Sequence, residues 1–156
     1  MPHELDTPSP PEPPVRVATF EQLDVHTAYR LWALRSQVFV VEQDCPYLDL
    51  DGRDAEPSAR HLWVEVDGLP VSTLRLLEDD GGRALRIGRV ATAESARGTG
   101  LAAALLRAAL GLAGERDVVL DAQSHLADWY AGFGFAPDGR GFVEDGIPHT
   151  PMRRRG

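Results

Sequence analysis

The chain has 156 residues, 43% of them hydrophobic, and a formal net charge of −8. This length is sufficient for one domain with a buried core, and the negative charge argues against nonspecific binding to DNA or RNA, which requires a basic surface. All 16 basic residues are arginine. This excludes a phosphate-binding P-loop and Schiff-base catalysis, because both need a lysine.

Further classes of protein are excluded by particular residues or their absence. One cysteine, Cys45, cannot form an intrachain disulfide framework. No apolar stretch approaches the ~20 residues of a membrane-spanning helix, and the N-terminus lacks the basic flank and apolar core of a signal peptide. His61, His125 and His149 lack the spacing of metal ligands, so we expect no bound metal. We therefore expect a cytoplasmic protein that binds neither membranes nor nucleic acid.

The N-terminal part is predicted to contain a tail, a strand and a helix. Residues 1–14 are rich in proline and acidic side chains and have no apolar pattern, which is typical of a flexible tail. The domain then covers residues 15–156. Val15–Phe20 has the composition of a strand, and Glu21–Leu34 has the apolar spacing of an amphipathic helix. The residues predicted to form its apolar face are Leu23, Tyr29 (or His26), Leu31 and Leu34.

An antiparallel meander is predicted for the central part of the chain. Val38–Val41 is apolar, whereas the acidic segment Asp44–Pro57, with two prolines, is expected to be a loop or a short irregular helix. From His61 onward, apolar and polar residues alternate with a period of two. Turn signals at Asp67-Gly68 and at residues 79–82 separate the strands. The predicted strands are His61–Val66, Val71–Leu77 and Leu85–Thr92.

Helices and strands alternate in the C-terminal part. Leu101–Leu112 is almost entirely Ala and Leu, the best helix formers, and Gly114 is suited to ending that helix. Val118–Leu120 predicts a short buried strand, so that the third meander strand, the helix and this strand form a parallel crossover. A helix over Leu126–Gly132, capped by Ser124, and strand-like segments at Phe135 and at residues 149–154 complete the domain. The predicted fold class is α/β, with a mixed, mostly antiparallel sheet flanked by helices.

The segment Arg97–Ala102, with the sequence Arg-Gly-Thr-Gly-Leu-Ala, joins the third meander strand to the Ala/Leu helix. Backbone N–H groups at the start of a helix have no intrahelical acceptor and can bind anions. Gly98 and Gly100 have no Cβ that would keep a phosphate away from the backbone. Because Ala103 follows, the dinucleotide pattern Gly-x-Gly-x-x-Gly is not met. The loop indicates a phosphorylated ligand, although a turn of this kind can also be only a tight connection.

This order of elements, with a glycine turn after the third meander strand, resembles the GCN5-related N-acetyltransferase (GNAT) family. Arg97–Ala102 satisfies the family's pyrophosphate motif, Arg/Gln-x-x-Gly-x-Gly/Ala, and Trp129–Phe135 looks like its Tyr-x-x-x-Gly-Phe segment. The resemblance implies a GNAT-type fold. A closer similarity is to the ElaA-like branch, in which the N-terminal helical segment forms the acceptor side of the cleft. The segments that carry it are Leu34-Arg35, Val38–Tyr47, Asp49–Gly52, Ile87–Val90 and Asp145–His149.

The resemblance also implies a cofactor and the residues that bind it. Acetyl-CoA would be the co-substrate, with its pantetheine arm along the open edge of the strand at Val90, Ala91 and Thr92. A backbone N–H there would polarise the thioester carbonyl. Gln123 stands where the family commonly has an asparagine that contacts pantetheine, and Tyr130 stands where a tyrosine protonates the leaving thiolate. The residues expected at the pyrophosphate are Arg97, Gly98, Thr99, Gly100, Leu101 and Ala102.

Other interpretations of single residues stay open at this point. Tyr130 is also suited to anchoring its helix to the sheet. Glu42 is a candidate catalytic base or a group that holds a cationic acceptor, and a surface carboxylate is the plain alternative. Glu65 is a further candidate base. Histidine is a common catalytic base, so His125 and His149 are also candidates, although a helix-cap or hairpin role is simpler for both.

The sequence therefore predicts an acyltransferase that moves an acetyl group from acetyl-CoA to an amine by direct attack. The expected partner is a small-molecule or peptide amine, and a homodimer is left open. One alternative is a non-catalytic acyl-CoA-binding module, which would keep Arg97–Ala102 and need no Tyr130. Another is an acyltransferase like the acyl-homoserine-lactone synthases, to which the region from Arg35 to Tyr47 is similar.

Overall fold

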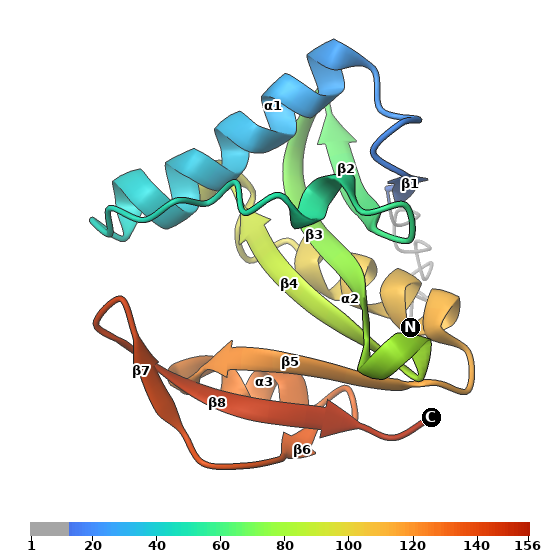
Figure 1. The fold of residues 1–156 in the computed structure, drawn as a ribbon. Helices are drawn as coiled ribbons and strands as arrows, with labels where there is room; N and C mark the ends of the chain where they lie inside the picture. The colour runs from blue at the N-terminus through green and yellow to red at the C-terminus, as the bar shows by residue number, and fades with distance from the viewer. Residues whose placement is uncertain (1–12) are drawn as a thin grey trace, which may run out of the picture.

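A central sheet of eight strands organises the chain in the computed structural model, which describes residues 13–156 (Figure 1). The predicted tail, residues 1–14, lies outside the described residues apart from its last two. The strands are β1 (Arg16–Ala18), β2 (Arg60–Val66), β3 (Leu69–Asp79), β4 (Ala84–Thr92), β5 (Asp117–Gln123), β6 (Ala136–Pro137), β7 (Phe142–Glu144) and β8 (Ile147–Arg154). Their order is β1-β2-β3-β4-β5-β8-β6, and β7 pairs with β8. Strands β4 and β5 run parallel, and the other pairs are antiparallel.

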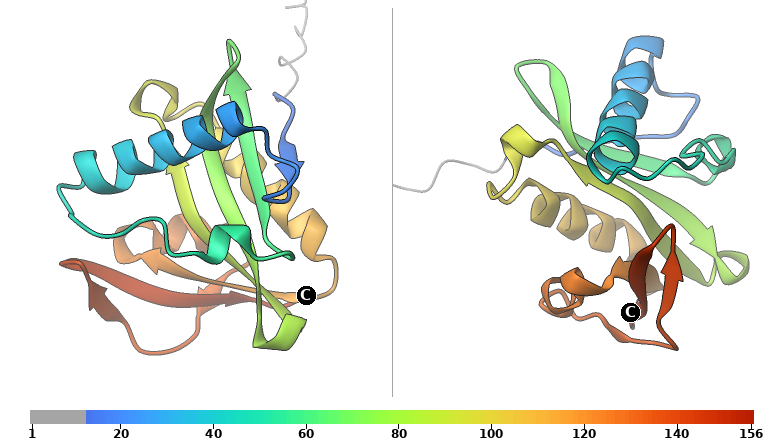
Figure 2. Two further views of the ribbon diagram at one scale, coloured as in Figure 1. Left: turned by 45° about the horizontal axis from the view of Figure 1, so that its top comes forward. Right: turned by 90° about the vertical axis from the view of Figure 1, so that its left-hand side faces the viewer.

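Helices cover both faces of the sheet (Figure 2). Helix α1 (Val25–Ser36) continues into a π-helical segment, Gln37–Glu42, and packs against β3 and β4 on one face. Helix α2 (Leu101–Ala113) packs against β2 to β5 on the other face, and the short helix α3 (Ala127–Ala131) follows β5. The longest of these helices, α2, has 13 residues, and no helix of residues 13–156 is long and apolar enough to cross a membrane.

The larger hydrophobic core lies between the sheet and α2, whereas two smaller clusters lie under α1 and the π-helical segment. On the α2 side, Leu62, Leu74 and Leu105 are almost completely buried. On the α1 side, Leu31 packs with Trp63, and Leu34 packs with Ala91 near the end of β4. The α2 face is therefore closed by apolar packing over most of the sheet, and room for a cleft remains on the α1 face.

Two irregularities of β4 shape the centre of the sheet. Strand β4 pairs with β5 at its first three residues, Ala84–Arg86, and the two strands have no further register pairs. The pairing of β4 with β3 shifts between Thr73 and Arg75, and Arg89 has a positive φ of 52°. This is a β-bulge, which inserts an extra residue and re-aims a side chain. The second half of β4 consequently has one edge free of strand pairing, next to β5.

The predicted fold class is confirmed, and the differences from the prediction concern the ends of elements and one short strand that was not predicted. Helix α1 begins at Val25 and not at Glu21, because Asp24 caps it by accepting a 2.9 Å hydrogen bond from the Thr27 N–H. Its buried residues are Leu31, Leu34 and Arg35. Tyr29 was predicted to belong to this apolar face, but it is 76% exposed.

The region after β5 also differs from its prediction. Ser124 does not cap the following helix, since α3 begins at Ala127 and the Ser124 hydroxyl lies 2.9 Å from the Thr150 hydroxyl. Strand β7, which is only three residues long, was not predicted. It forms a hairpin with β8 through Asp145 and Gly146, whose φ values of 51° and 76° are those that a type I′ turn requires.

Candidate active site

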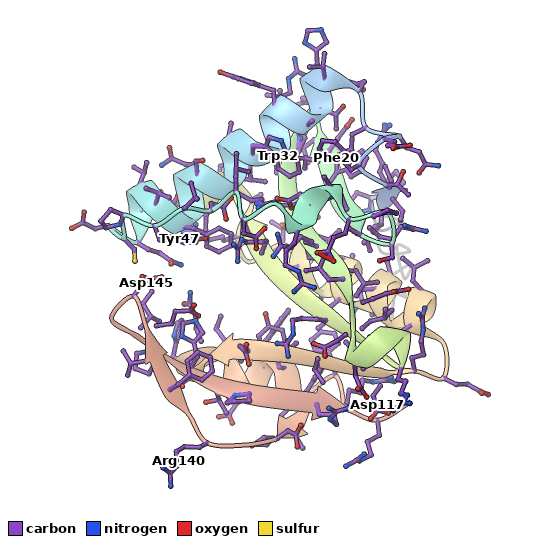
Figure 3. The ribbon with its side chains drawn as sticks, in the orientation of Figure 1. Phe20, Trp32, Tyr47, Asp117, Arg140 and Asp145 are labelled. Carbon is purple, nitrogen blue, oxygen red and sulfur yellow. The ribbon has the colours of Figure 1, made fainter. Side chains whose placement is uncertain are left out.

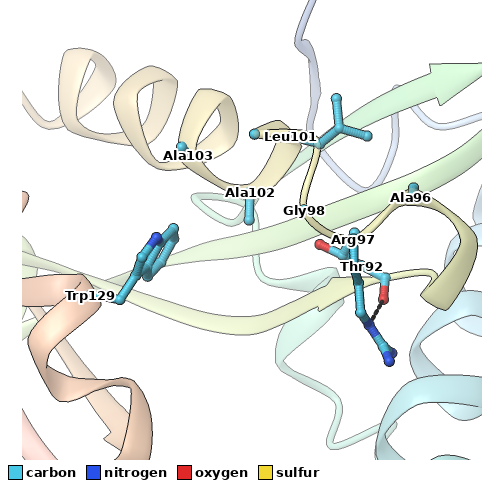
Figure 4. Close-up of a pocket in the computed structure, with 9 residues that line it drawn as sticks. Thr92, Ala96, Arg97, Gly98, Leu101, Ala102, Ala103 and Trp129 are labelled. Carbon is cyan, nitrogen blue, oxygen red and sulfur yellow. Dashed lines mark hydrogen bonds between the residues drawn. The ribbon is translucent and has the colours of Figure 1, made fainter.

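The loop between β4 and α2 has two glycines in left-handed conformation just before the start of a helix (Figure 4). Gly98 and Gly100 have φ values of 76° and 82°, which non-glycine residues rarely adopt. Gly100 is the N-cap of α2 and offers no side chain, and the first hydrogen bond of the helix runs from the Ala104 N–H to the Gly100 carbonyl at 3.1 Å. The N–H groups of residues 101–103 come before this bond and have no acceptor within the helix. They carry the positive end of the helix dipole.

A pocket of about 240 Å³ lies over this loop. Arg97 is held at its edge, because its Nε donates to the Thr92 carbonyl at 3.1 Å and its Nη2 pairs with the Glu42 carboxylate. Glu42 comes from the π-helical segment, 55 residues earlier in the chain. The pocket is lined by Thr92, Ala96, Arg97, Gly98, Gly100, Leu101, Ala102, Ala103 and Trp129. Thr99 is outside this lining, and its hydroxyl donates to the Ala96 carbonyl at 2.5 Å.

The loop pocket opens into a larger cleft of about 1030 Å³ on the α1 side of the diverging strands. Four residues line both spaces: Thr92, Arg97, Ala102 and Trp129. One wall of the cleft comes from the π-helical segment and the loop after it, and the other comes from β5, the residues that follow it, and the β7–β8 hairpin. A ligand bound at the glycine loop can therefore extend into the cleft without leaving the protein surface.

Most of the residues predicted for catalysis and cofactor binding meet around these two spaces. Glu42, Val90, Gln123 and Tyr130 line the cleft together with residues of the loop. Ala91 is 2% exposed and packs under α1, so its side chain is not part of the lining. The other candidate carboxylate, Glu65, lies outside the cleft.

Glu65 belongs to a small polar group on the outer strands. Its Oε1 accepts a 3.1 Å hydrogen bond from the Trp63 indole, and its Oε2 pairs with Arg16 at 3.4 Å. Glu65 lies on β2, next to the edge strand β1. Strands β3 and β4 therefore separate Glu65 from the place where β4 and β5 diverge.

Tyr130 lies on α3 with its ring packed in the core and its edge on the cleft. Its ring centroid is 4.9 Å from that of Trp129 and 6.1 Å from that of Phe135, and the residue is 6% exposed. Its hydroxyl has no hydrogen-bond partner among residues 13–156. Burial raises the pKa of Tyr130 to about 12. The phenol therefore keeps its proton at neutral pH, in a place where a ligand in the cleft can receive it.

A cluster of three arginines and three aspartates underlies the α1 wall, and sequence reasoning missed it. Arg35 is 1% exposed and pairs with Asp49 at 2.9 Å and with Asp54 at 2.7 Å. Arg75, on β3, pairs with Asp51 at 2.8 Å and with Asp54 at 3.3 Å. The acidic segment Asp44–Pro57, predicted to be a loop or a short irregular helix, contains one 3-10 turn at Arg53–Ala55. Buried charge pairs fix it to α1 and to the sheet.

The third arginine of this cluster, Arg89, is the residue at the β4 bulge. Its Nη2 donates to the Asp49 carbonyl at 3.0 Å, and its guanidinium lies 5.6 Å from the centre of the Tyr47 ring. Burial tends to raise the pKa of Asp51. Hydrogen bonds from Arg75 and from the Arg53 N–H act against burial, as do the positive charges of Arg75 and Arg89, and together they hold this pKa well below its usual value. The positive φ of Arg89 could not be predicted from the sequence, because the residue that adopts it is not a glycine.

The tip of the β7–β8 hairpin closes one end of the cleft. The Cys45 thiol donates a 3.5 Å hydrogen bond to the Asp145 carbonyl, so the hairpin touches the loop that follows the π-helical segment. In Figure 3 the tip of the hairpin, labelled at Asp145, lies directly below the loop that is labelled at Tyr47. His149, near the start of β8, also lines the cleft.

In this mixed sheet the parallel strands β4 and β5 diverge beside a glycine turn and a helix N-terminus. This arrangement defines the class of protein: it has a GNAT-type acyltransferase fold. Comparison with known proteins agrees with this. The acetyltransferase (GNAT) domain family matches residues 25–155. The chain is 48% identical over 139 residues to the UPF0039 protein Rv2851c of Mycobacterium tuberculosis, covering 87% of this chain and 89% of that protein. It is 39% identical to Protein ElaA of Escherichia coli over 138 residues, covering 85% and 90%.

Solved structures show the same relationship. The crystal structure of an acyl-CoA N-acyltransferase from Pseudomonas aeruginosa has a TM-score of 0.85 and 37% identity, covering 90% of this chain and 99% of that one. The crystal structure of Escherichia coli ElaA has a TM-score of 0.85 and 35% identity, covering 91% and 99%. The chain therefore belongs to the GNAT acetyltransferase family, and within it to the ElaA-like branch. Family membership supports acyltransferase activity in general.

Proposed function

We propose that this protein is an acetyl-CoA-dependent N-acetyltransferase that transfers the acetyl group to an amine by direct attack on the thioester. The observation that carries the proposal is the continuity between the glycine-loop pocket and the cleft beside the diverging strands. A coenzyme A molecule has an anionic pyrophosphate and a long pantetheine arm. The glycine-loop pocket would hold the pyrophosphate, and the cleft that opens from it would hold the arm.

The two parts of the cofactor are matched by different backbone groups. The pyrophosphate would bind the N–H groups at the start of α2, with Arg97 as its charged ligand and Gly98 and Gly100 allowing close approach. The pantetheine arm would lie along the unpaired edge of β4 at Val90–Thr92, with the Gln123 amide as a further polar contact. A backbone N–H on this edge would supply the donor that polarises the thioester carbonyl.

The catalytic step would use the Tyr130 hydroxyl. The amine attacks the carbonyl carbon, the C–N bond forms, and the C–S bond breaks with its electron pair going to sulfur. The Tyr130 phenol, which is protonated at neutral pH, gives its proton to this sulfur. Glu42 would act on the cofactor side, by holding the Arg97 guanidinium in place beside the loop. The acceptor would be a small-molecule or peptide amine that enters from the α1 face.

A non-catalytic acyl-CoA-binding module is the alternative that shares the anion site. Such a module would need the glycine loop, but it would have no use for a phenol whose hydroxyl faces the cleft without a partner in the described part of the chain. The unpartnered hydroxyl of Tyr130 favours the enzyme.

The cofactor assignment is tested by the thermal shift that acetyl-CoA causes. A ligand that binds only the folded state raises the melting temperature by mass action, so millimolar acetyl-CoA should stabilise the wild type. Gly100→Val should abolish this rise, because it places a side chain beside the phosphate and strains a residue with φ +82°. Gly111→Val, in the last turn of α2 where an added Cβ also meets no atom within 4 Å, is the control far from the loop and should keep the rise. No shift in the wild type would refute the assignment.

A further inference from the structure

We infer that His149 is the general base that removes the proton from the acceptor's ammonium group. The inference rests on the proposed function and deepens it, since direct attack by an amine requires a free lone pair on nitrogen. An alkylamine is mostly protonated at neutral pH, so a group on the acceptor side of the cleft has to accept that proton. His149 lines the cleft and is partly buried.

The contacts of the imidazole fix which of its nitrogens can act as the base. His149 Nδ1 lies 2.7 Å from the Ile147 carbonyl oxygen. A carbonyl can only accept a hydrogen bond, so Nδ1 carries the hydrogen and, in the neutral ring, Nε2 carries the lone pair. The ring also stacks on Phe142, with centroids 5.3 Å apart and planes within 10° of each other. The imidazole is therefore held in one orientation and one tautomer, as a general base requires.

The strand register places His149 on the acceptor face of the sheet. Val118, Leu120 and Ala122 of β5 belong to the core under α2, so the alternate residues, including Gln123, face the other side. His149 is directly opposite Gln123 in the pairing of β5 with β8, and paired residues share a face.

Tyr130 approaches the cleft from the opposite side of the sheet. It belongs to the core cluster under α2, together with Phe135. The acid and the base would therefore act on the thioester from opposite faces of the diverging strands, the base on the side where the acceptor enters.

Other ionisable groups face the same space, and most of them are already engaged. Glu42 pairs with Arg97, Asp121 pairs with Arg86 at 3.1 Å, and Arg89 and Tyr47 belong to the buried cluster. Glu144 and Asp145 lie on the exposed hairpin next to His149. Their negative charges favour a cationic acceptor beside the imidazole.

His125 is the other histidine of the cleft, and its surroundings differ from those of His149. Its side chain is exposed, and its ring has no hydrogen bond or stacking partner in the part of the chain that the structure describes. A base must be held in a defined position to accept a proton efficiently, and this requirement favours His149 over His125.

The proton and electron changes of the complete step balance. His149 Nε2 takes one proton from the ammonium group and returns it to solvent. The free amine then forms the C–N bond as the C–S bond breaks. Sulfur gains the proton of the Tyr130 hydroxyl, and the phenolate recovers the second nitrogen proton as the amide forms. The products are the amide and the free thiol of coenzyme A, with one proton released, and no other reactant is needed.

The test compares two acceptors that differ in whether a proton has to be removed. The probes are n-butylamine, which is cationic at neutral pH, and butanoic hydrazide, which is neutral there. With full-length His149→Phe, which keeps an aromatic ring on Phe142, we expect kcat/KM for butylamine at pH 7 to fall by roughly 10²–10⁴. We expect kcat/KM for the hydrazide to stay within a few-fold. The value of the variant for butylamine should rise with pH as the fraction of free amine rises, because the variant has no imidazole at position 149 to remove the proton.

Two further variants separate the base from a structural role. Phe142→Leu removes the stacking partner but keeps the imidazole and its contact with the Ile147 carbonyl, so kcat/KM for butylamine relative to the hydrazide should fall much less than in His149→Phe. His26→Gln, on the exposed first turn of α1 and outside the cleft lining, should match the wild type. The inference would be overturned if His149→Phe lowered kcat/KM equally for both acceptors or for neither. It would also be overturned if His125→Gln or Glu42→Gln, and not His149→Phe, lowered kcat/KM for butylamine alone.

The outcomes for the wild type distinguish this inference from the proposed function. If the wild type acetylates either probe and His149→Phe does so equally well, the inference fails and the proposed function stands. If the wild type acetylates no amine while it binds acetyl-CoA, the proposed function and the inference both fail.

Discussion

Replacing Tyr130 with phenylalanine tests the assignment of the catalytic acid. The change keeps the ring, which packs on Trp129 and Phe135, and removes only the hydroxyl. Because that hydroxyl bonds to none of the described residues, its removal leaves no buried group without a partner. We therefore expect the free energy of unfolding to change by less than about 1 kcal/mol, and the Kd of acetyl-CoA to stay within a few-fold.

The same substitution should have a large effect on turnover. A positioned acid contributes roughly 10²–10⁴ to the rate, which corresponds to about 3–5 kcal/mol in the barrier. The assay is the release of free thiol from acetyl-CoA in single-turnover experiments, so that product release does not mask the chemical step. Unchanged single-turnover rates would refute the reasoning and leave Tyr130 with a packing role only. A loss of stability as large as the loss of rate would refute it as well.

Three further substitutions test other parts of the structure. Arg35→Ala should lower the free energy of unfolding by about 3 kcal/mol, because Asp49 and Asp54 each lose one buried partner and keep only Arg89 and Arg75. Urea titration at pH 7 measures this, and a loss below about 1 kcal/mol would contradict it. His61→Gln should flatten the pH dependence of stability between about pH 7 and pH 5. Burial lowers the pKa of His61 in the folded state, so its contribution is complete above about pH 6.5, the unfolded value, and is lost as the pH falls; an unchanged slope in thermal melts would count against this. Arg97→Gln should raise the Kd of acetyl-CoA about tenfold or more, the usual effect of losing a charged hydrogen bond, as calorimetry can show, and an unaltered Kd would remove Arg97 from the site.

The elements that the sequence predicted are those whose causes are local. The period of two after His61, the turns at Asp67-Gly68 and residues 79–82, and the Ala/Leu run from Leu101 each depend on neighbouring residues. The glycine loop was equally visible, because a left-handed φ at Gly98 and Gly100 requires glycine. These features were sufficient to predict the sheet, helix α2 and the glycine loop that joins them.

The features that the sequence did not reveal depend on contacts between distant residues. The pairing of Arg35 with Asp49 and Asp54 needs the fold to bring an α1 residue onto the following loop. The pairing of Glu42 with Arg97 spans 55 residues. The bulge at Arg89 follows no local signal, since its positive φ is stabilised by the buried aspartates.

The β7–β8 hairpin is an intermediate case. Strand β7 is too short to show a periodic pattern, but the Asp145-Gly146 turn is a signal that could have predicted the hairpin. The hairpin matters for the site because it carries His149 and closes one end of the cleft.

The most direct test of the central claim is to identify the products that the wild-type protein forms from acetyl-CoA and a panel of amines. Mass spectrometry should detect the acetylated amine, and thiol titration should give an equal amount of free coenzyme A. Both should disappear in Gly100→Val and persist in Gly111→Val. Binding of acetyl-CoA with no acetylated product from any amine, or release of thiol as free acetate forms in place of amide, would contradict the account.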